Sequence, residues 1–307
     1  MREVSHTGRS VRAPATRATI LRSAVTRLRR ARLYYGHGTE NARDDAAALL
    51  AHALRLRRPL EVKDLQGPLS RLAADRFEAL LARRMKERLP VVYLTGRCWF
   101  AGLPFYVDQR VLIPRSPIAE LIERRFAPWV DADCVRRIAD LGTGSGCIAL
   151  ACAMAFPRAQ VDAVDIDPAA LAVARINREA LRLARRVRVV KSDFFRQLGA
   201  RRYDMIVSNP PYVGAKEYAS LPPEYAHEPA AALLSGEDGM QAVRVLLRGA
   251  LRHLTPQGVL IVEVGNTETT VQREFPHLPF TWLSFERGGG GVFLLTARQL
   301  RAARGSF

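Results

Sequence analysis

Cysteine is scarce in this chain of 307 residues, and its four copies match no metal-binding spacing. Cys98, Cys134, Cys147 and Cys152 form neither a C-x-x-C pair nor a zinc-finger pattern. We therefore expect reduced thiols, a reducing and cytoplasmic compartment, and no structural metal. Long apolar runs are also missing, because the longest, 148–156, is about half of the roughly 20 residues that a spanning helix needs. The sequence predicts no membrane span.

Lysine is rare although the chain is strongly basic. Lys and Arg total 47 against 30 Asp and Glu, a formal net charge of +17, and lysine occurs only at positions 63, 86, 191 and 216. Such a charge would attract nucleic acid or a nucleoprotein particle through counterion release. The other interpretation is a compositional bias towards Arg and Ala, which extends along the whole chain. Both interpretations stay open at this point.

The first third of the chain has the pattern of helices. Residues 1–39 contain nine arginines and a single acid, Glu3, which resembles a transit peptide in composition. However, apolar residues recur at helical spacing from Ile20 to Tyr35. We predict a disordered basic tail over 1–15, then a helical bundle over 16–90 that recognises the substrate. Alternation over 91–113 predicts a β-hairpin linker, with a turn at Ala101-Gly102.

From residue 114 to residue 307, strand and helix patterns alternate, which predicts an α/β fold with a seven-stranded, mostly parallel sheet. The strand 137–141 leads into the glycine-rich loop 142–146 and then into a helix. Glycines let a backbone approach a ligand, and a helix N-terminus attracts the ligand's negative or polar end. The loop lacks the Gly-Lys-Ser/Thr ending of an ATP-binding P-loop, so a ligand without phosphates fits better.

Two further strand ends carry acidic residues suited to an adenosine group. Asp165 closes the strand 160–164, nineteen residues after Gly146, near the spacing of an acid that binds ribose hydroxyls. Asp193 and Phe194 follow the strand 187–191, where a carboxylate can accept from an exocyclic amine and a ring can pack on adenine. The alternatives are a helix-capping carboxylate and a buried phenylalanine. Asp167, which precedes Pro168, is the better cap.

The strand 204–208 stops at Asn209-Pro210-Pro211-Tyr212, because consecutive prolines cannot continue a ladder. A planar amide or exocyclic amine is a poor nucleophile, since its lone pair is delocalised. If the Asn209 side-chain oxygen and the Pro210 carbonyl each accept one N–H, the lone pair turns towards an electrophile and the growing positive charge is stabilised. Tyr212 could place its ring on the planar group. A strand ended by an ordinary turn is the alternative.

These motifs, in this order and spacing, resemble the class I S-adenosylmethionine-dependent methyltransferases that act on amide or exocyclic amine nitrogens. The likeness covers nearly the whole chain. The segment 97–115, with Phe-Tyr-Val-Asp and Ile-Pro-Arg, and the segment 228–239 are similar to the protein-glutamine methyltransferases. The sequence Pro-Arg-Ser-Pro-Ile at 114–118 is similar to the branch acting on large-subunit ribosomal protein three (uL3), whereas release-factor enzymes usually read Pro-Arg-Pro-Glu-Thr.

The resemblance implies a Rossmann-like domain that binds S-adenosylmethionine. The cofactor-binding residues would be Gly142, Thr143, Gly144, Ser145, Gly146, Asp165, Asp193, Phe194 and Asn209. The substrate glutamine would be held by Asn209, Pro210, Pro211 and Tyr212, with Asn209, Pro210 and Tyr212 catalytic. It further implies a cytoplasmic enzyme of ribosome biogenesis. The net charge of +17, in addition, would suit a contact between its basic surface and ribosomal RNA. Alternatives are a release-factor glutamine methyltransferase, an N(6)-adenine methyltransferase of RNA or DNA, and a non-enzymatic RNA-binding assembly factor.

Overall fold

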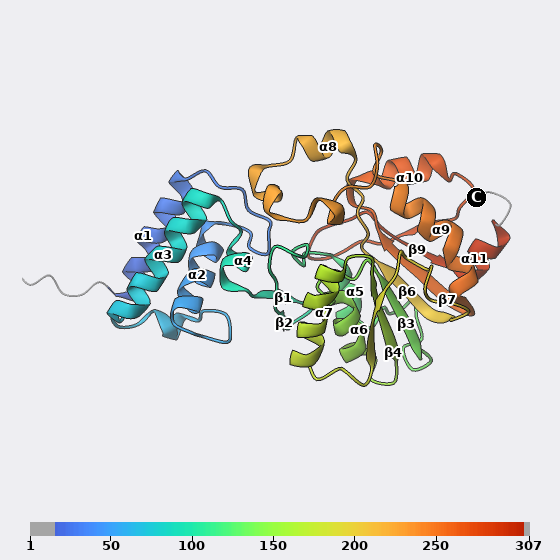
Figure 1. Cartoon of the computed structure of the whole chain (residues 1–307), viewed down its shortest axis with the longest axis horizontal. Helices are drawn as coiled ribbons and strands as arrows, with labels where there is room; N and C mark the ends of the chain where they lie inside the picture. Colours follow the sequence, from blue (N-terminus) through green and yellow to red (C-terminus); the bar gives the residue numbers. More distant parts are fainter. Residues whose placement is uncertain (1–15, 304–307) are drawn as a thin grey trace, which may run out of the picture. The chain divides into compact units, whose positions relative to one another are not determined.

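The computed structural model describes residues 16–303, so the tail predicted over 1–15 lies outside the described residues (Figure 1). The chain forms two compact units. Within the described residues, one contains 16–35 and 39–95, and the other contains 36–38 and 96–303. None of the helices in these residues is both long and apolar enough to cross a membrane.

The first unit is a bundle of helices, each begun by a capping side chain or by proline. It comprises α1 (Arg17–Arg30), α2 (Ala42–Ala53), the 3-10 helix η1 (Val62–Leu65), α3 (Arg71–Glu87) and α4 (Val91–Thr95). The side chains of Thr16, Asn41 and Ser70 accept backbone N–H groups at the starts of α1, α2 and α3, which satisfies donors that no carbonyl inside the helix can reach.

A buried ion pair crosses the core of this bundle. The Arg84 guanidinium donates from Nε to Asp45 Oδ2 at 2.7 Å, and both side chains are almost fully buried. The same guanidinium donates to the backbone carbonyls of Tyr34 and Arg88. Desolvation raises the pKa of Asp45, and the charge of Arg84 opposes that shift. The pair is therefore fully hydrogen-bonded inside an otherwise apolar core.

The hairpin predicted over 91–113 is confirmed in part. Strands β1 (Cys98–Phe100) and β2 (Leu103–Phe105) pair around the expected turn, where Ala101 and Gly102 both have positive φ. The expectation was wrong for 91–95, which form α4. Pro90 starts this helix, since its carbonyl accepts from the backbone N–H of Tyr93 and Leu94. Its apolar side chains are buried in the bundle, so tertiary packing decided the structure here.

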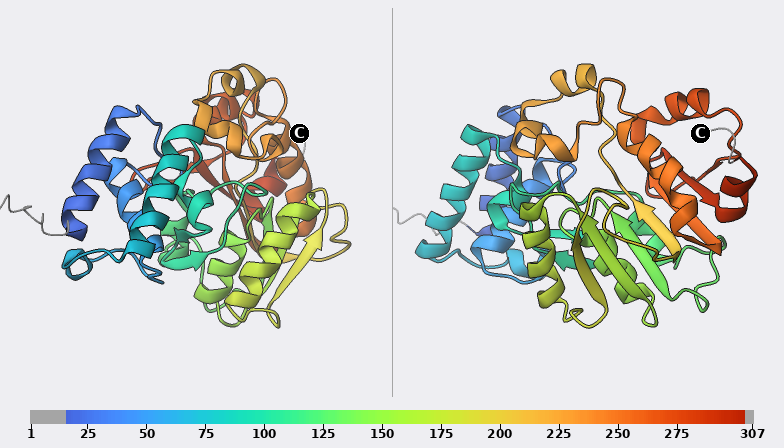
Figure 2. Two further views of the ribbon diagram at one scale, coloured as in Figure 1. Left: turned by 60° about the vertical axis from the view of Figure 1, so that its left-hand side comes forward. Right: turned by 45° about the vertical axis from the view of Figure 1, so that its right-hand side comes forward.

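The second unit is a sheet with helices on both faces, as Figure 2 shows. After β1 and β2 it contains α5 (Ile118–Glu123), β3 (Arg137–Leu141), α6 (Cys147–Ala155), β4 (Gln160–Asp165), α7 (Pro168–Ala180), β5 (Val187–Lys191), β6 (Tyr203–Ser208), α8 (Ala215–Ala219), η2 (Pro223–His227), η3 (Ala230–Ala232), α9 (Gln241–His253), β7 (Leu254–Glu263), η4 (Gly265–Thr267), α10 (Glu268–Glu274), β8 (Thr281–Trp282), β9 (Val292–Thr296) and α11 (Ala297–Ala302).

The strand order β5-β4-β3-β6-β7-β9-β8 confirms the predicted seven-stranded sheet. The first five strands in this order are parallel, whereas β9 runs antiparallel to both β7 and β8. The order reverses between β3 and β6. In open α/β sheets ligands bind outside the carboxyl ends of the strands at such a switch point. We therefore expect a ligand site at the loops after β3 and β6.

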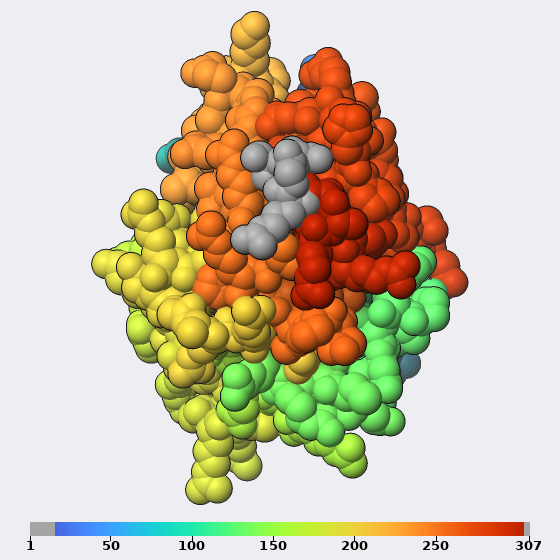
Figure 3. Space-filling view, turned by 90° about the vertical axis from the view of Figure 1, so that its right-hand side faces the viewer, coloured from blue at the N-terminus to red at the C-terminus, as the bar shows by residue number. Residues whose placement is uncertain are grey.

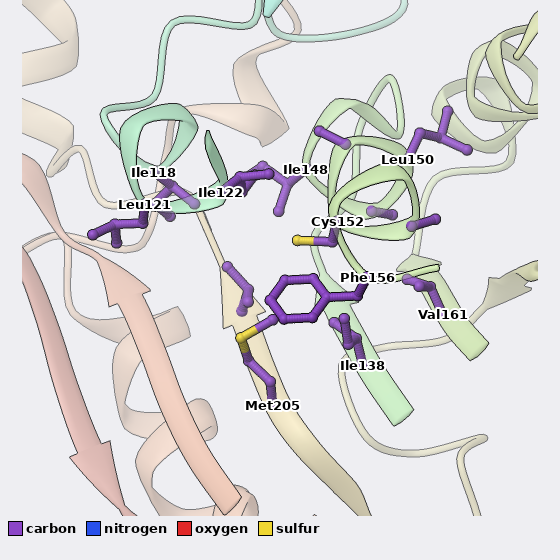
Figure 4. Packing of buried hydrophobic residues seen from close by; sticks show 14 of the residues in the cluster. Ile118, Leu121, Ile122, Ile138, Ile148, Leu150, Cys152, Phe156, Val161 and Met205 are labelled. Carbon is purple, nitrogen blue, oxygen red and sulfur yellow. The ribbon is translucent and has the colours of Figure 1, made fainter. Parts of the chain in front are cut away.

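Apolar cores lie on both faces of the sheet. On one face α5 and α6 bury residues such as Ile118, Ile148 and Phe156 against β3 and β6 (Figure 4). On the other face α9 and α11 pack side by side over β7, and their segments form part of the surface seen in Figure 3. Because both faces are covered, the central strands are mostly apolar, with Asp140 in β3 and Asp162 in β4 as buried exceptions.

Candidate active site

A cavity of about 330 Å³ lies at the carboxyl edge of the sheet, beside the switch point. The residues that line it are Arg110, Val111, Leu112, Gly142, Gly144, Asp165, Ile166, Asp167, Ala170, Ser192, Asp193, Phe194, Asn209, Pro211, Pro229, Ala231, Ala232, Leu234, Ser235, Gln241, Ala242 and Val245. The loops after β3, β4, β5 and β6 all contribute. Parallel strands bring their carboxyl ends to one edge, so motifs far apart in the sequence meet around one space.

The glycine-rich loop uses its glycines in two ways. Gly142 and Gly144 line the cavity and have φ of +74° and +53°. A Cβ at Gly142 would come within 3.9 Å of the Asn209 carbonyl oxygen, so the loop lies directly against the segment after β6. Gly146 serves helix packing, because a Cβ there would come within 3.2 Å of Ala174 in α7. The loop is thus packed against the segment after β6 at Gly142 and against α7 at Gly146.

Thr143 and Ser145 point into the protein and are buried. The Thr143 hydroxyl donates to Asp140 Oδ2 at 2.5 Å, and the same oxygen accepts the Ala149 backbone N–H at 3.0 Å. Burial raises the pKa of Asp140 to about 7. Asp140 therefore joins the loop to the first turn of α6, and neither Thr143 nor Ser145 is among the residues that line the cavity.

The Asp165 carboxylate is fixed by backbone donors from both sides. Its Oδ2 accepts the Gly144 N–H at 2.8 Å, and its Oδ1 accepts the Asp167 N–H at 3.0 Å. Burial raises the pKa of Asp165, while these hydrogen bonds oppose the shift. Each carboxylate oxygen can still accept a second hydrogen bond. Asp167 accepts the Ala169 N–H at 2.8 Å, which confirms the capping role predicted for it.

Phe194 reaches the cavity through a strained turn. Its φ of +44° is uncommon for a bulky residue, and such conformations persist where the surroundings hold them. The Ser192 hydroxyl supplies that support, because it donates to the Phe194 carbonyl at 2.8 Å and accepts the Gln197 N–H at 3.0 Å. The neighbouring Asp193 side chain is 41% exposed and lies 3.5 Å from Arg196. Both predicted adenine residues therefore line the cavity.

Asn209 and the prolines follow β6 at the centre of this edge. The Ser208 hydroxyl donates to the Leu141 carbonyl at 2.6 Å, which ties the end of β6 to the end of β3. Asn209 and Pro211 line the cavity, and Pro210 is buried beside them. The Asn209 Oδ1 atom is buried and has no hydrogen-bond partner among the described residues. A buried amide oxygen of this kind costs free energy unless a donor satisfies it.

Tyr212, which we predict to contact the substrate, is not among the residues that line the cavity. Its hydroxyl donates to Glu263 Oε1 at 3.2 Å, and its ring lies so close to Gly265 that a Cβ there would be 2.5 Å from Cε2. Burial raises the pKa of Tyr212 far above its ordinary value. These contacts with Glu263 and Gly265 hold the Asn-Pro-Pro-Tyr segment in place.

Glu263 is a residue that sequence reasoning missed. It ends β7, next to the end of β6, and is buried between the hydroxyls of Tyr212 and Ser116, both of which donate to it. Burial raises its pKa to about 7, and the two hydrogen bonds oppose that shift. A glutamate at the end of an apolar strand was the only sequence signal, and it does not say which side chains meet there.

A second buried network, centred on Glu228, supports the same region. Arg115 donates to both oxygens of Glu228, at 2.8 and 2.9 Å, and the Ile113 N–H donates to Oε2 at 2.9 Å. His37 Nε2 lies 3.1 Å from Oε1, and the Arg115 guanidinium lies over the ring of Tyr225. Burial by itself would raise the pKa of Glu228, but the hydrogen bond from His37 and the charge of Arg115 lower it.

Comparisons with known proteins show the family of the chain. Residues 124–236 match the family model described as a methyltransferase small domain, and residues 19–96 match the PrmC N-terminal domain. A ribosomal protein uL3 glutamine methyltransferase of Neisseria meningitidis serogroup B is 46% identical over 282 residues, which are 92% of this chain and 93% of that protein. The protein of that name from Neisseria gonorrhoeae is 45% identical over 282 residues, covering 92% and 94%. This chain therefore belongs to the ribosomal protein uL3 glutamine methyltransferase family.

Proposed function

We propose that this protein transfers a methyl group from S-adenosylmethionine to the side-chain amide nitrogen of a glutamine in ribosomal protein uL3. Family membership over nearly the whole chain supports the substrate. The observation that carries the chemistry is the position of Asn209, a cavity residue with a buried and unsatisfied amide oxygen at the switch point of the sheet. An acceptor in that place suits a substrate that brings N–H donors.

The cavity fits the cofactor. S-adenosylmethionine supplies an electrophilic methyl group when it is bound. At about 330 Å³ the cavity is within the usual range for small-molecule sites, although near its lower end. We assign Gly142 and Gly144 to backbone contacts, Asp165 to the ribose hydroxyls, and Asp193 with Phe194 to the adenine. Thr143, Ser145 and Gly146 support the loop through their packing and hydrogen bonds.

The chain contributes orientation and charge stabilisation. We assign the Asn209 Oδ1 atom and the Pro210 carbonyl to the two hydrogens of the substrate amide, so that the nitrogen lone pair faces the methyl group. These fixed acceptors also stabilise the positive charge that grows on nitrogen in the transition state. Pro210 and Pro211 lack N–H groups that would compete for the acceptors. Tyr212 acts by positioning, because its contact with Glu263 holds the segment in place.

We further propose that the helical bundle of residues 16–90 recognises the substrate. The reaction would take place in the cytoplasm, where ribosomal proteins meet ribosomal RNA. The support for the role of the bundle is that residues 19–96 match a domain model of their own. The cofactor cavity, in contrast, is lined only by residues of the second unit. A contact with ribosomal RNA through the basic surface is also part of the proposal.

The test uses S-adenosylmethionine labelled in its methyl group and three acceptors: purified uL3, a release factor and RNA. We expect label in uL3. Transfer only to the release factor or only to RNA would overturn the proposed substrate and favour the corresponding alternative.

Substitution of Asn209 tests the proposed chemistry separately from the choice of substrate. Asn209→Ala should lower kcat by about 10²- to 10³-fold, the usual cost of removing one preorganised hydrogen-bonding group, while changing cofactor affinity little. Asn266→Ala is the matched control, because Asn266 is an exposed asparagine outside the cavity lining. If Asn209→Ala instead abolishes cofactor binding and leaves kcat of the bound enzyme unchanged, the assigned role of Asn209 is wrong.

A further inference from the structure

A second hollow lies at the opposite edge of the sheet from the cofactor cavity. It has a volume of about 440 Å³ and is formed where the parallel strands begin. Its lining residues are Arg137, Gln160, Val161, Asp162, Arg188, Arg201 and Tyr203. Arg137 and Gln160 are the first residues of β3 and β4, so the hollow opens at the amino edge of the sheet. None of the residues assigned to methyl transfer lines it.

A buried carboxylate forms the floor of this hollow. Asp162 is only 6% exposed, and its two oxygens accept from Arg188 Nε and Nη2, each at 2.8 Å. The Tyr203 hydroxyl donates to the same carboxylate at 2.6 Å. A bidentate guanidinium and a phenol together satisfy a buried aspartate well. Asp162 therefore needs no further cation for its own charge.

Two more arginines nevertheless surround the same space. Arg201 lies 3.6 Å from Asp162 and is 52% exposed, and Arg137 is exposed and forms no ion pair among the described residues. Three arginines against one aspartate give the lining a formal charge of 3 − 1 = +2. Like charges held close together repel each other, and this repulsion is relieved when an anion binds between them.

We propose that this hollow binds a phosphate group of an RNA backbone. Guanidinium groups offer planar pairs of N–H donors that match phosphate oxygens, and the donors here come from β3, β5 and the segment before β6. The exposure of Arg137 and Arg201 lets a polymer reach them, and the net charge of +17 favours a polyanion. The choice of ribosomal RNA as the natural ligand rests on the proposed function, whereas phosphate recognition does not.

The test measures binding of a fluorescein-labelled 20-nucleotide single-stranded RNA to the full chain at several salt concentrations. We expect the double variant Arg137→Gln/Arg201→Gln to bind about tenfold more weakly at moderate salt, for any RNA sequence. The slope of log affinity against log salt should become less steep by about 0.7 for each arginine removed, the value for a single strand. Asp162 and Arg188 stay in place, so the buried pair and the fold are retained, which thermal unfolding verifies.

The paired substitutions Arg175→Gln and Arg185→Gln are the matched control, because they also remove two positive charges, from exposed arginines that do not line the hollow. Equal loss of RNA affinity in the control and the double variant would overturn the proposal, because charge alone would then explain binding. Absence of RNA binding by the wild-type chain would overturn it as well. Methyl transfer to purified uL3 without RNA should be unchanged in the double variant, so the two proposals succeed or fail separately.

Discussion

Replacement of Glu263 by glutamine should change how the stability of the protein depends on pH. Glu263 is 5% exposed, and burial raises the pKa of its carboxyl group from an ordinary 4.5 to about 7 in the folded protein. The folded state therefore binds the proton more tightly than the unfolded chain does. Stability from this group is fully present below about pH 4.5 and is lost as the pH rises towards 7.

The size of the change in stability follows from the two pKa values of Glu263, 4.5 in the unfolded chain and about 7 in the folded protein. A rise from 4.5 to about 7 corresponds to about 3 kcal/mol of stability lost between acid and neutral pH. Glu263→Gln removes the ionisation but keeps the side-chain length, and its amide oxygen can still accept from Tyr212. We expect the variant to gain up to about 3 kcal/mol relative to the wild type as the pH rises through this window, and the difference to level off above about pH 8.

Urea unfolding at half-unit pH intervals between 4.5 and 8.5 measures this difference. Asp140, whose pKa burial also raises to about 7, contributes equally to both proteins and cancels in the comparison. Glu237→Gln serves as the control, because Glu237 is exposed and should give a flat difference. A flat difference for Glu263→Gln too would refute the reasoning, since the carboxylate would then be as well solvated in the folded protein as in the unfolded chain.

Three further predictions test other parts of the structure. Gly265→Ala should destabilise the protein by about 1–3 kcal/mol by forcing the Tyr212 ring aside, whereas Gly290→Ala, which has open space around it, should be nearly neutral in thermal unfolding. Arg84→Met should cost about 3–5 kcal/mol, because Asp45 loses its buried partner; a smaller loss in urea unfolding would mean that water reaches Asp45. A thiol reagent should modify one cysteine per folded chain rapidly, the exposed Cys134, and two or more fast thiols would contradict the burial of the others.

Much of the fold and of the lining of the cavity was predictable because each motif is local. The loop 142–146, Asp165, Asp193 and Asn209 each directly follow an apolar strand pattern, and a parallel sheet brings such positions to one edge. The helix 91–95 was missed, since a short apolar segment fits a strand or a helix equally well until its packing is known.

The networks behind the site were not predictable in the same way. Ser116 and Glu263 are 147 residues apart in sequence, and Arg115 and Glu228 are 113 apart. No periodicity connects such pairs, because they meet only through the order of the strands and the paths of the loops. The same holds for the contacts of Tyr212 with Gly265 and Glu263, which lie more than 50 residues away in sequence.

The sequence by itself determined the α/β class, the strand ends that carry functional side chains, and the family to which those motifs belong. It could do so because helix and strand periods, proline and glycine act on the backbone within a few residues. Only the tertiary structure decided which loop residues face the cavity, that Tyr212 contacts Glu263, and that three arginines surround Asp162. These features depend on contacts between distant segments, and such contacts exist only once the strands have taken their order in the sheet.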